Sequence, residues 1–181
     1  MILVFHFNNK ITEVLTTANQ KIKFDHTDNI ALGLQKLAFQ FPDEIMVWCY
    51  ALYKEYLNVE EISAFFHHNK MMLSYNPGNA NFFDNTIGYV EESPFIKINK
   101  QRAYPKWQMS TCVGVVHASL LLEIKDKIFL DNDFGYYLNS VAKVFMPLGL
   151  FCYSHSGLLI KSDKMDRFDK PKTSICMLFK F

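Results

Sequence analysis

The feature that most constrains this chain is the alternation of short apolar runs with longer segments of helical periodicity. The runs have the length and composition of strands, and most lack the polar-apolar alternation of a half-exposed strand. We therefore expect both of their faces to be covered, as in a parallel sheet. The runs are Ile2 to Phe7, Ile45 to Cys49, Met71 to Tyr75, Thr86 to Val90, Cys112 to Val116 and Gly149 to Tyr153.

The segments between these runs carry apolar residues at helical spacing. In the first, Asp28 is the predicted N-cap and Pro42 ends the helix. Strands that alternate with helices of this length predict an α/β fold with a mainly parallel central sheet flanked by helices. The other predicted helices begin at Asn58, where Glu61 completes a capping-box pattern, after His117, and near Phe134.

Length and charge narrow the possible organisation and partners. A chain of 181 residues that is 50% apolar predicts one domain over residues 1–181. Lys and Arg number 19 against 18 Asp and Glu, so the chain has no net field to attract nucleic acid, and no nucleic-acid partner is expected.

The cysteines and the apolar runs indicate a cytoplasmic protein. Cys49, Cys112, Cys152 and Cys176 stand alone within apolar runs, which predicts buried thiols and not a zinc site or redox motif. No run approaches the roughly 20 apolar residues of a membrane span, and the first residues do not form a signal peptide. We expect a chain without a membrane span, in a reducing compartment.

Ligands of open α/β sheets gather beyond the carboxyl ends of the parallel strands. In this sequence those positions are rich in amide and aromatic side chains: Asn8 and Asn9, Tyr50, the loop from Tyr75 to Asn81, and Ser154 to Ser156. The sequence predicts a binding site at this edge, with Asn8, Asn9 and Tyr50 as substrate-binding candidates.

The order of these pieces resembles the GT-A fold, in particular the inverting glycosyltransferases of family two. The segments that carry the resemblance are HFNNK, DNIALGLQKLAFQFPDEIMVW, STCVGVVHASLLLEI and DNDFGYYLNSVAKVFMPLGLFCYSHSGLL. The resemblance implies a truncated nucleotide-diphospho-sugar transferase-like domain that acts in glycan or polysaccharide assembly, with a nucleotide-sugar or glycan as ligand.

The departures from that family are informative. The slot of its metal-binding DxD motif holds Cys49, Tyr50 and Ala51, which offer none of the hard oxygen ligands that Mg or Mn prefers. Only about twenty residues separate Asn9 from the helix at Asn29, too few for the family's second βαβ unit. We therefore expect a degenerate catalyst with no cofactor, and a divalent metal such as Mn or Mg only if an unusual site exists.

The family's general base is a carboxylate at the start of its last helix. Asp133 is the nearest carboxylate that could take that role, and it is our catalytic candidate. The alternative is that Asp131 to Asp133 cap the helix, where the macrodipole favours negative charge.

Two further residues are candidates for ligand contact. Trp107 lies in NKQRAYPKWQMS, where basic and aromatic residues interleave, and it either contacts a ligand at the edge of the site or is buried under its loop. His117 follows a strand, so it is either an acceptor-site residue or a polar contact at a helix start. Both are predicted as substrate-binding residues, with these structural alternatives left open.

A different class of function also fits the sequence. The heavy aromatic content, with 17 Phe and 9 Tyr, is consistent with a non-catalytic protein-interaction or regulatory module. The chain ends on the apolar run SICMLFKF, which would suit a strand at the sheet edge or the point where a longer polypeptide continues. On the second interpretation the chain is the N-terminal module of a larger protein, with a missing C-terminal domain as its partner.

Overall fold

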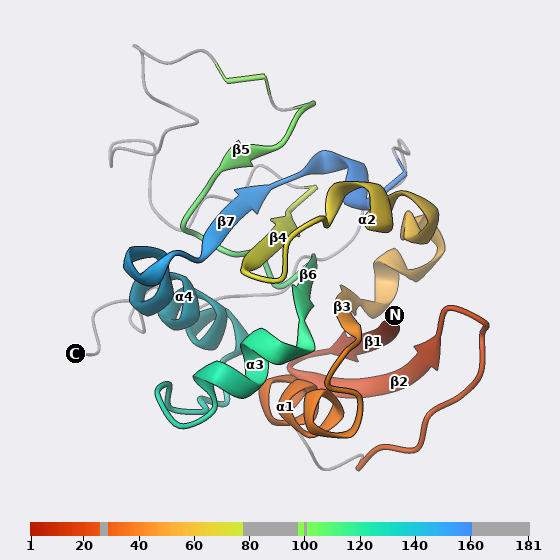
Figure 1. Cartoon of the computed structure of the whole chain (residues 1–181). Helices are drawn as coiled ribbons and strands as arrows, with labels where there is room; N and C mark the ends of the chain where they lie inside the picture. The colour runs from red at the N-terminus through yellow and green to blue at the C-terminus, as the bar shows by residue number, and fades with distance from the viewer. Residues whose placement is uncertain (26–28, 78–97, 100, 161–181) are drawn as a thin grey trace.

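A computed structural model describes residues 1–25, 29–77, 98, 99 and 101–160 of the chain. Its strands are β1 (Ile2–Phe7), β2 (Lys10–Thr16), β3 (Ile45–Tyr50), β4 (Met71–Tyr75), β5 (Tyr104–Pro105), β6 (Val113–His117) and β7 (Phe151–Ser154). Within the described residues these seven strands form one sheet in the order β2-β1-β3-β6-β4-β7-β5 (Figure 1). The prediction of an α/β fold is confirmed.

The sheet is mixed, and in this respect the expectation of a mainly parallel sheet needs correction. β1 pairs parallel with β3, and β4 pairs parallel with β7. All other pairings are antiparallel, because β2 folds straight back along β1 and β6 runs against both of its neighbours. As a result β1, β3, β4 and β7 still share one direction, and their carboxyl ends lie at the same edge of the sheet.

The β1–β2 hairpin was not predicted from the sequence. Its loop consists of Asn8 and Asn9, both with positive φ, at 47° and 62°. Positive φ at both central residues is the signature of a type I′ turn, which Asn tolerates and which suits the twist of paired strands. The outer side of β2 is in turn paired by the segment that follows it, through a bridge between Leu15 and Lys21.

The predicted helices are present. The N-cap of the first is Asn29, whose Oδ1 accepts from the backbone N–H of Leu32; Asp28 lies outside the described residues. The capping box at the second is not formed: Asn58 makes no side-chain cap bond, and its amide group donates to the Gly157 carbonyl. The bounds are α1 (Ile30–Gln40), α2 (Val59–Phe65), α3 (Ala118–Ile124), α4 (Phe134–Phe145) and the 3₁₀ helices η1 (Ala51–Tyr56), η3 (Met146–Leu148) and η4 (Ser156–Leu158).

Helices cover both faces of the sheet. One face packs against α1, α3 and α4, and the other against η1, α2 and η4 (Figure 1). The two cores follow the alternation of side chains along the strands. The first core receives Ile2, Val4, Met46 and Trp48, and the second receives Leu3, Phe5, Val47 and Cys49.

The cysteines and the length of the helices were also predicted from the sequence. Cys49, Cys112 and Cys152 are buried free thiols, as predicted. Within the described part of the chain, no helix combines the length and the apolar character that crossing a bilayer requires. The predicted strand from Thr86 to Val90, Cys176 and the apolar C-terminal run lie outside the described residues.

Candidate functional site

The carboxyl edge of β1, β3, β4 and β7 is crossed by the segment that leads into β6. The Ser110 backbone N–H donates to Ser74 Oγ at 2.9 Å, and the Ser110 carbonyl accepts from Trp48 Nε1 at 3.0 Å. The Tyr50 backbone N–H donates to the Cys112 carbonyl at 2.6 Å. These bonds tie the edge together, so the side chains on it are held in fixed positions.

Tyr50 is the last residue of β3, at the position where the sequence resemblance places a metal-binding motif. Its ring is buried, with 3% of the residue exposed. The Phe7 ring stacks on it at 5.3 Å between centroids, and the His6 ring meets it edge-on at 5.5 Å. Phe7 is 42% exposed and forms the outer surface of this aromatic cluster. The accessible surface of the cluster is therefore the Phe7 ring, with Tyr50 beneath it.

His6 belongs to the same cluster but was not a candidate in the sequence. It is buried between Tyr50 and the Phe134 ring, and its Nε2 lies 2.8 Å from the Thr111 carbonyl oxygen. A carbonyl only accepts, so Nε2 carries the proton, and Nδ1 has no partner among the described residues. Burial lowers the pKa of His6 to about 4, so the ring is neutral near pH 7. A lone histidine within the apolar run of β1 was the available signal.

Asn8 and Asn9, predicted to bind substrate, are the central residues of the hairpin turn. Asn9 also has a structural role, because its carbonyl accepts from the Ile30 backbone N–H at the start of α1. The side chain of the α1 cap, Asn29, donates to Asn132 Oδ1 at 2.9 Å, just before α4. The hairpin turn and the first turns of two helices thus meet beside the aromatic cluster, where exposed Asn8 presents its amide.

Asp133 caps α4. Its carboxylate accepts from the Tyr136 backbone N–H at 3.0 Å, and Asp131 in turn accepts from the Asp133 backbone N–H at 2.8 Å. Asp131 and Asp133 thus have the capping role that the sequence offered as the alternative to a catalytic base. In the described segments, no group of three or more His, Cys, Asp or Glu side chains is placed to share a metal ion.

The capping arrangement makes a prediction for Asp133. Asp133→Ala should lower the free energy of unfolding by about 1 kcal/mol, because it removes the acceptor for the Tyr136 backbone N–H in the first turn of α4. Asp133→Asn should retain most of the stability, since an amide oxygen also caps. Urea denaturation followed by circular dichroism measures both, and equal losses in the two variants would contradict the capping role.

The other two candidates, His117 and Trp107, do not lie in the aromatic cluster. His117 pairs with Ile45 at the beginning of β3, so it lies at the opposite edge of the sheet from Tyr50. Its Nδ1 lies against Ser119, and the side chain caps α3. Trp107 follows the outermost strand, β5, and is 41% exposed, so it is not buried under its loop. Asn8, Asn9 and Tyr50 are brought together, and His117 is not.

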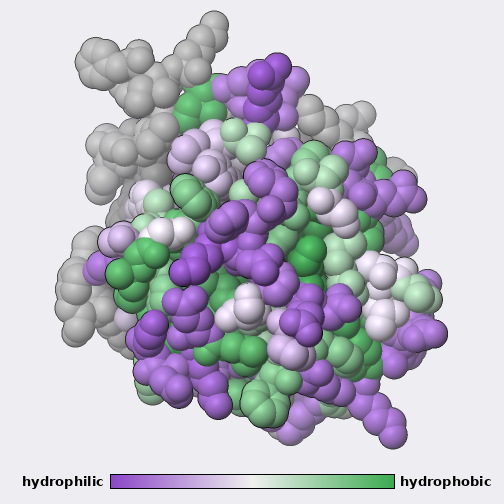
Figure 2. All heavy atoms as spheres, viewed as in Figure 1, coloured by the Kyte–Doolittle hydropathy of each residue, from purple (hydrophilic) through white to green (hydrophobic). Residues whose placement is uncertain are grey.

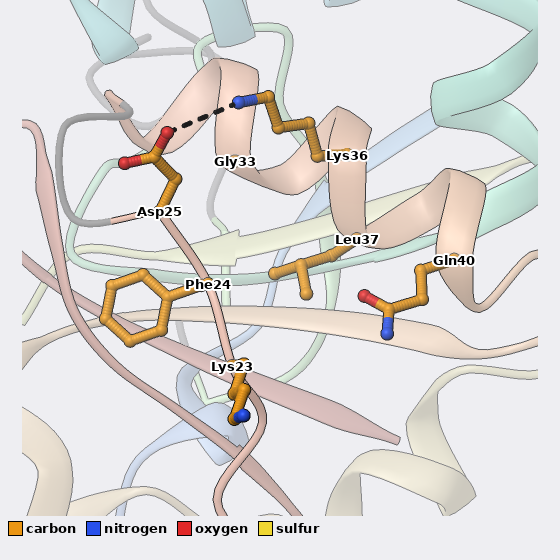
Figure 3. Close-up of a pocket in the computed structure, with 7 residues that line it drawn as sticks. All are labelled: Lys23, Phe24, Asp25, Gly33, Lys36, Leu37 and Gln40. Atoms are coloured by element: carbon orange, nitrogen blue, oxygen red, sulfur yellow. Dashed lines mark ion pairs between the residues drawn. The ribbon is translucent and has the colours of Figure 1, made fainter.

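A groove also lies beside α1. It has a volume of about 360 Å³ and lies between α1 and the segment Lys23–Asp25. Figure 3 shows Lys36 reaching from α1 to Asp25, an ion pair of 3.9 Å, while Leu37 and Gln40 project toward the segment. Both partners of the ion pair are about half exposed, so the pair contributes little to stability.

The fold and this edge define the class as an α/β protein with a mixed sheet, whose candidate site lies at the carboxyl ends of its co-directional strands. Comparisons with known proteins add no closer assignment: no family model, no curated protein and no solved structure matches this chain.

Proposed function

We propose that this chain is a shortened GT-A-like domain that binds a glycan or nucleotide-sugar ligand in glycan or polysaccharide assembly, with weak or no sugar transfer of its own. The observation that carries the proposal is the edge shared by four co-directional strands, where Phe7, Asn8 and Tyr50 lie together. An exposed ring offers a flat apolar surface for a sugar ring, and a neighbouring amide can hydrogen-bond its hydroxyls.

The same edge argues for binding over transfer. The Phe7 and Tyr50 rings stack at the end of β3, where a carboxylate pair would have to hold a metal and a diphosphate. The carboxylates of Asp131 and Asp133 already accept backbone hydrogen bonds at the start of α4. The cap occupies Asp133 Oδ1, which leaves only the other carboxylate oxygen to accept a proton from a substrate.

The proposal is tested by calorimetric titration of the protein with UDP-, GDP- and dTDP-sugars and with a panel of oligosaccharides, each with and without Mn or Mg. We expect binding of at least one ligand that does not depend on the metal. Phe7→Ala should weaken it about fivefold to tenfold, as the loss of one ring contact implies. Silence across both panels would contradict the proposal.

The matched control is Phe39→Ala. Phe39 is also an exposed phenylalanine, 75% accessible, but it lies near the end of α1 and not at the carboxyl edge. Its replacement should leave ligand affinity unchanged. A loss of affinity equal to that of Phe7→Ala would mean that the effect is not specific to the edge.

The second candidate is a non-catalytic protein-interaction module. It is favoured by the exposure of Phe39 and of Phe129, which is 81% accessible and follows the neighbouring helix α3. Figure 2 shows apolar residues interspersed with hydrophilic ones on the face that carries these helices. The mass of the protein in solution separates the candidates: self-association that Phe39→Ala abolishes supports this one, and a monodisperse monomer counts against it.

A further inference from the structure

A cavity of about 270 Å³ lies on the α2 side of the sheet, where β7 ends. It is smaller than the roughly 300–1,000 Å³ of common drug-sized sites, so it suits a ligand of one or two rings. Two histidines and one tyrosine are the ionisable side chains of the lining, and the other side chains are apolar. The lining residues are Ala64, Phe65, His67, Met71, Leu73, Ala103, Tyr153 and His155.

One wall of this cavity is a stacked pair of rings. The His155 and Phe65 rings lie 3.9 Å apart between centroids, with 25° between their planes. Gly157 permits this packing, because a Cβ at that position would come within 2.7 Å of the Phe65 ring and 2.9 Å of His155. The turn that follows β7 thus packs against this pair, which presents an aromatic surface next to the apolar side chains of Met71 and Leu73.

The hydrogen bonds of the two histidines define what they can offer a ligand. His155 Nδ1 accepts from the Gly157 backbone N–H at 3.0 Å, so the proton of the neutral ring is on Nε2. His67 Nδ1 lies 3.0 Å from the Phe65 carbonyl oxygen, so in the neutral ring the proton is on Nδ1 and Nε2 can accept. No hydrogen bond from the described residues occupies either Nε2 atom. Burial lowers the pKa of His155, which keeps that ring neutral.

We propose that this cavity binds an uncharged nitrogen heterocycle of the nucleobase type, which packs on the aromatic wall, accepts from His155 Nε2 and donates to His67 Nε2. The apolar side chains of Met71 and Leu73 favour a flat ring. His155 Nε2 as donor and His67 Nε2 as acceptor favour a ligand whose edge carries both an acceptor and a donor. This site does not depend on the glycan proposal, since it uses none of the residues of the Phe7 and Tyr50 cluster.

The test uses uracil and adenine as probes, followed through the imidazole and aromatic signals in NMR spectra of the whole protein. We expect one of the bases to shift the signals of His155 and Tyr153, and 1,3-dimethyluracil, which has lost its N–H donors, to bind less tightly than uracil. His67→Ala should weaken binding about threefold to tenfold, the effect of one hydrogen bond. His155→Phe, which keeps a ring for the stack, should weaken it at least as much.

The control is His68→Ala. His68 is the exposed neighbour of His67, but it packs edge-on against Phe151 and does not line the cavity. It should bind the bases as the unchanged protein does. Because His67 is exposed, its replacement is not expected to unfold the chain, so the test does not rely on His155 alone. The proposal is overturned if neither base shifts His155, or if binding persists undiminished in His67→Ala.

Discussion

Gly114→Ala is expected to lower the free energy of unfolding by about 3 kcal/mol, the upper range for forcing extra atoms into a packed core. Gly114 lies on β6 between β3 and β4, where the indole ring of Trp48 crosses it. A Cβ at this position would lie 2.6 Å from the Leu73 carbonyl oxygen and closer still to the Trp48 ring. The carbonyl belongs to the neighbouring strand, so it cannot move aside as a flexible side chain could.

Urea denaturation measures this loss, and Gly149→Ala is the matched control. Gly149 has a φ of 94°, but an added Cβ there meets no atom within 4 Å. Its replacement should cost about 1 to 2 kcal/mol, from the left-handed backbone alone. If Gly114→Ala destabilised the protein no more than this control, the result would contradict the close contact between the Trp48 ring and Gly114. Combining Gly114→Ala with Trp48→Phe should recover part of the loss, since the neighbouring ring becomes smaller.

The stability of the fold is expected to fall by about 3 kcal/mol between pH 6.5 and pH 4 through His6 alone. The pKa of His6 is lowered from 6.5 to about 4 in the folded chain, because burial penalises the charged ring. In that interval the unfolded chain binds the proton and the folded chain does not. The contribution of the neutral ring to the free energy of unfolding is therefore fully present above pH 6.5. It declines as the pH falls and is lost by about pH 4.

His6→Phe should flatten this part of the curve. Unfolding free energies measured at several pH values would show it, with the difference between variant and unchanged protein isolating His6 from the carboxylates that titrate at lower pH. His117→Gln is the control, since His117 lies at the other edge of the sheet and is more accessible than His6. An unchanged slope in His6→Phe would contradict the burial of this ring.

The local elements were predictable because their signals are local. The strand from Ile2 to Phe7 was predicted with its observed bounds, as was the strand from Met71 to Tyr75. Apolar runs of that length, bounded by turn residues, leave few alternatives. Asp133 shows the same: a carboxylate just before an apolar helical stripe carries its capping role in the sequence itself.

The candidate site was predictable only in outline. Asn8, Asn9 and Tyr50 were expected near one another, and they are, because the strands before them run in the same direction. The hairpin was missed, although the Asn-Asn pair suits a type I′ turn, because the stretch after Asn9 was considered only as too short for the second βαβ unit of the GT-A fold. His6 was missed because nothing in its neighbours along the chain indicates which residues would bury it.

The sequence by itself determined where the α-helices and most of the strands form, since propensity, capping and periodicity act over a few residues. Only the tertiary structure decided the direction of β6, the closure of Tyr50 under Phe7, and the position of His117 at the far edge. These depend on which strands pair and in which sense, and that choice comes from long-range packing, such as Trp48 against Gly114, between residues far apart in the chain.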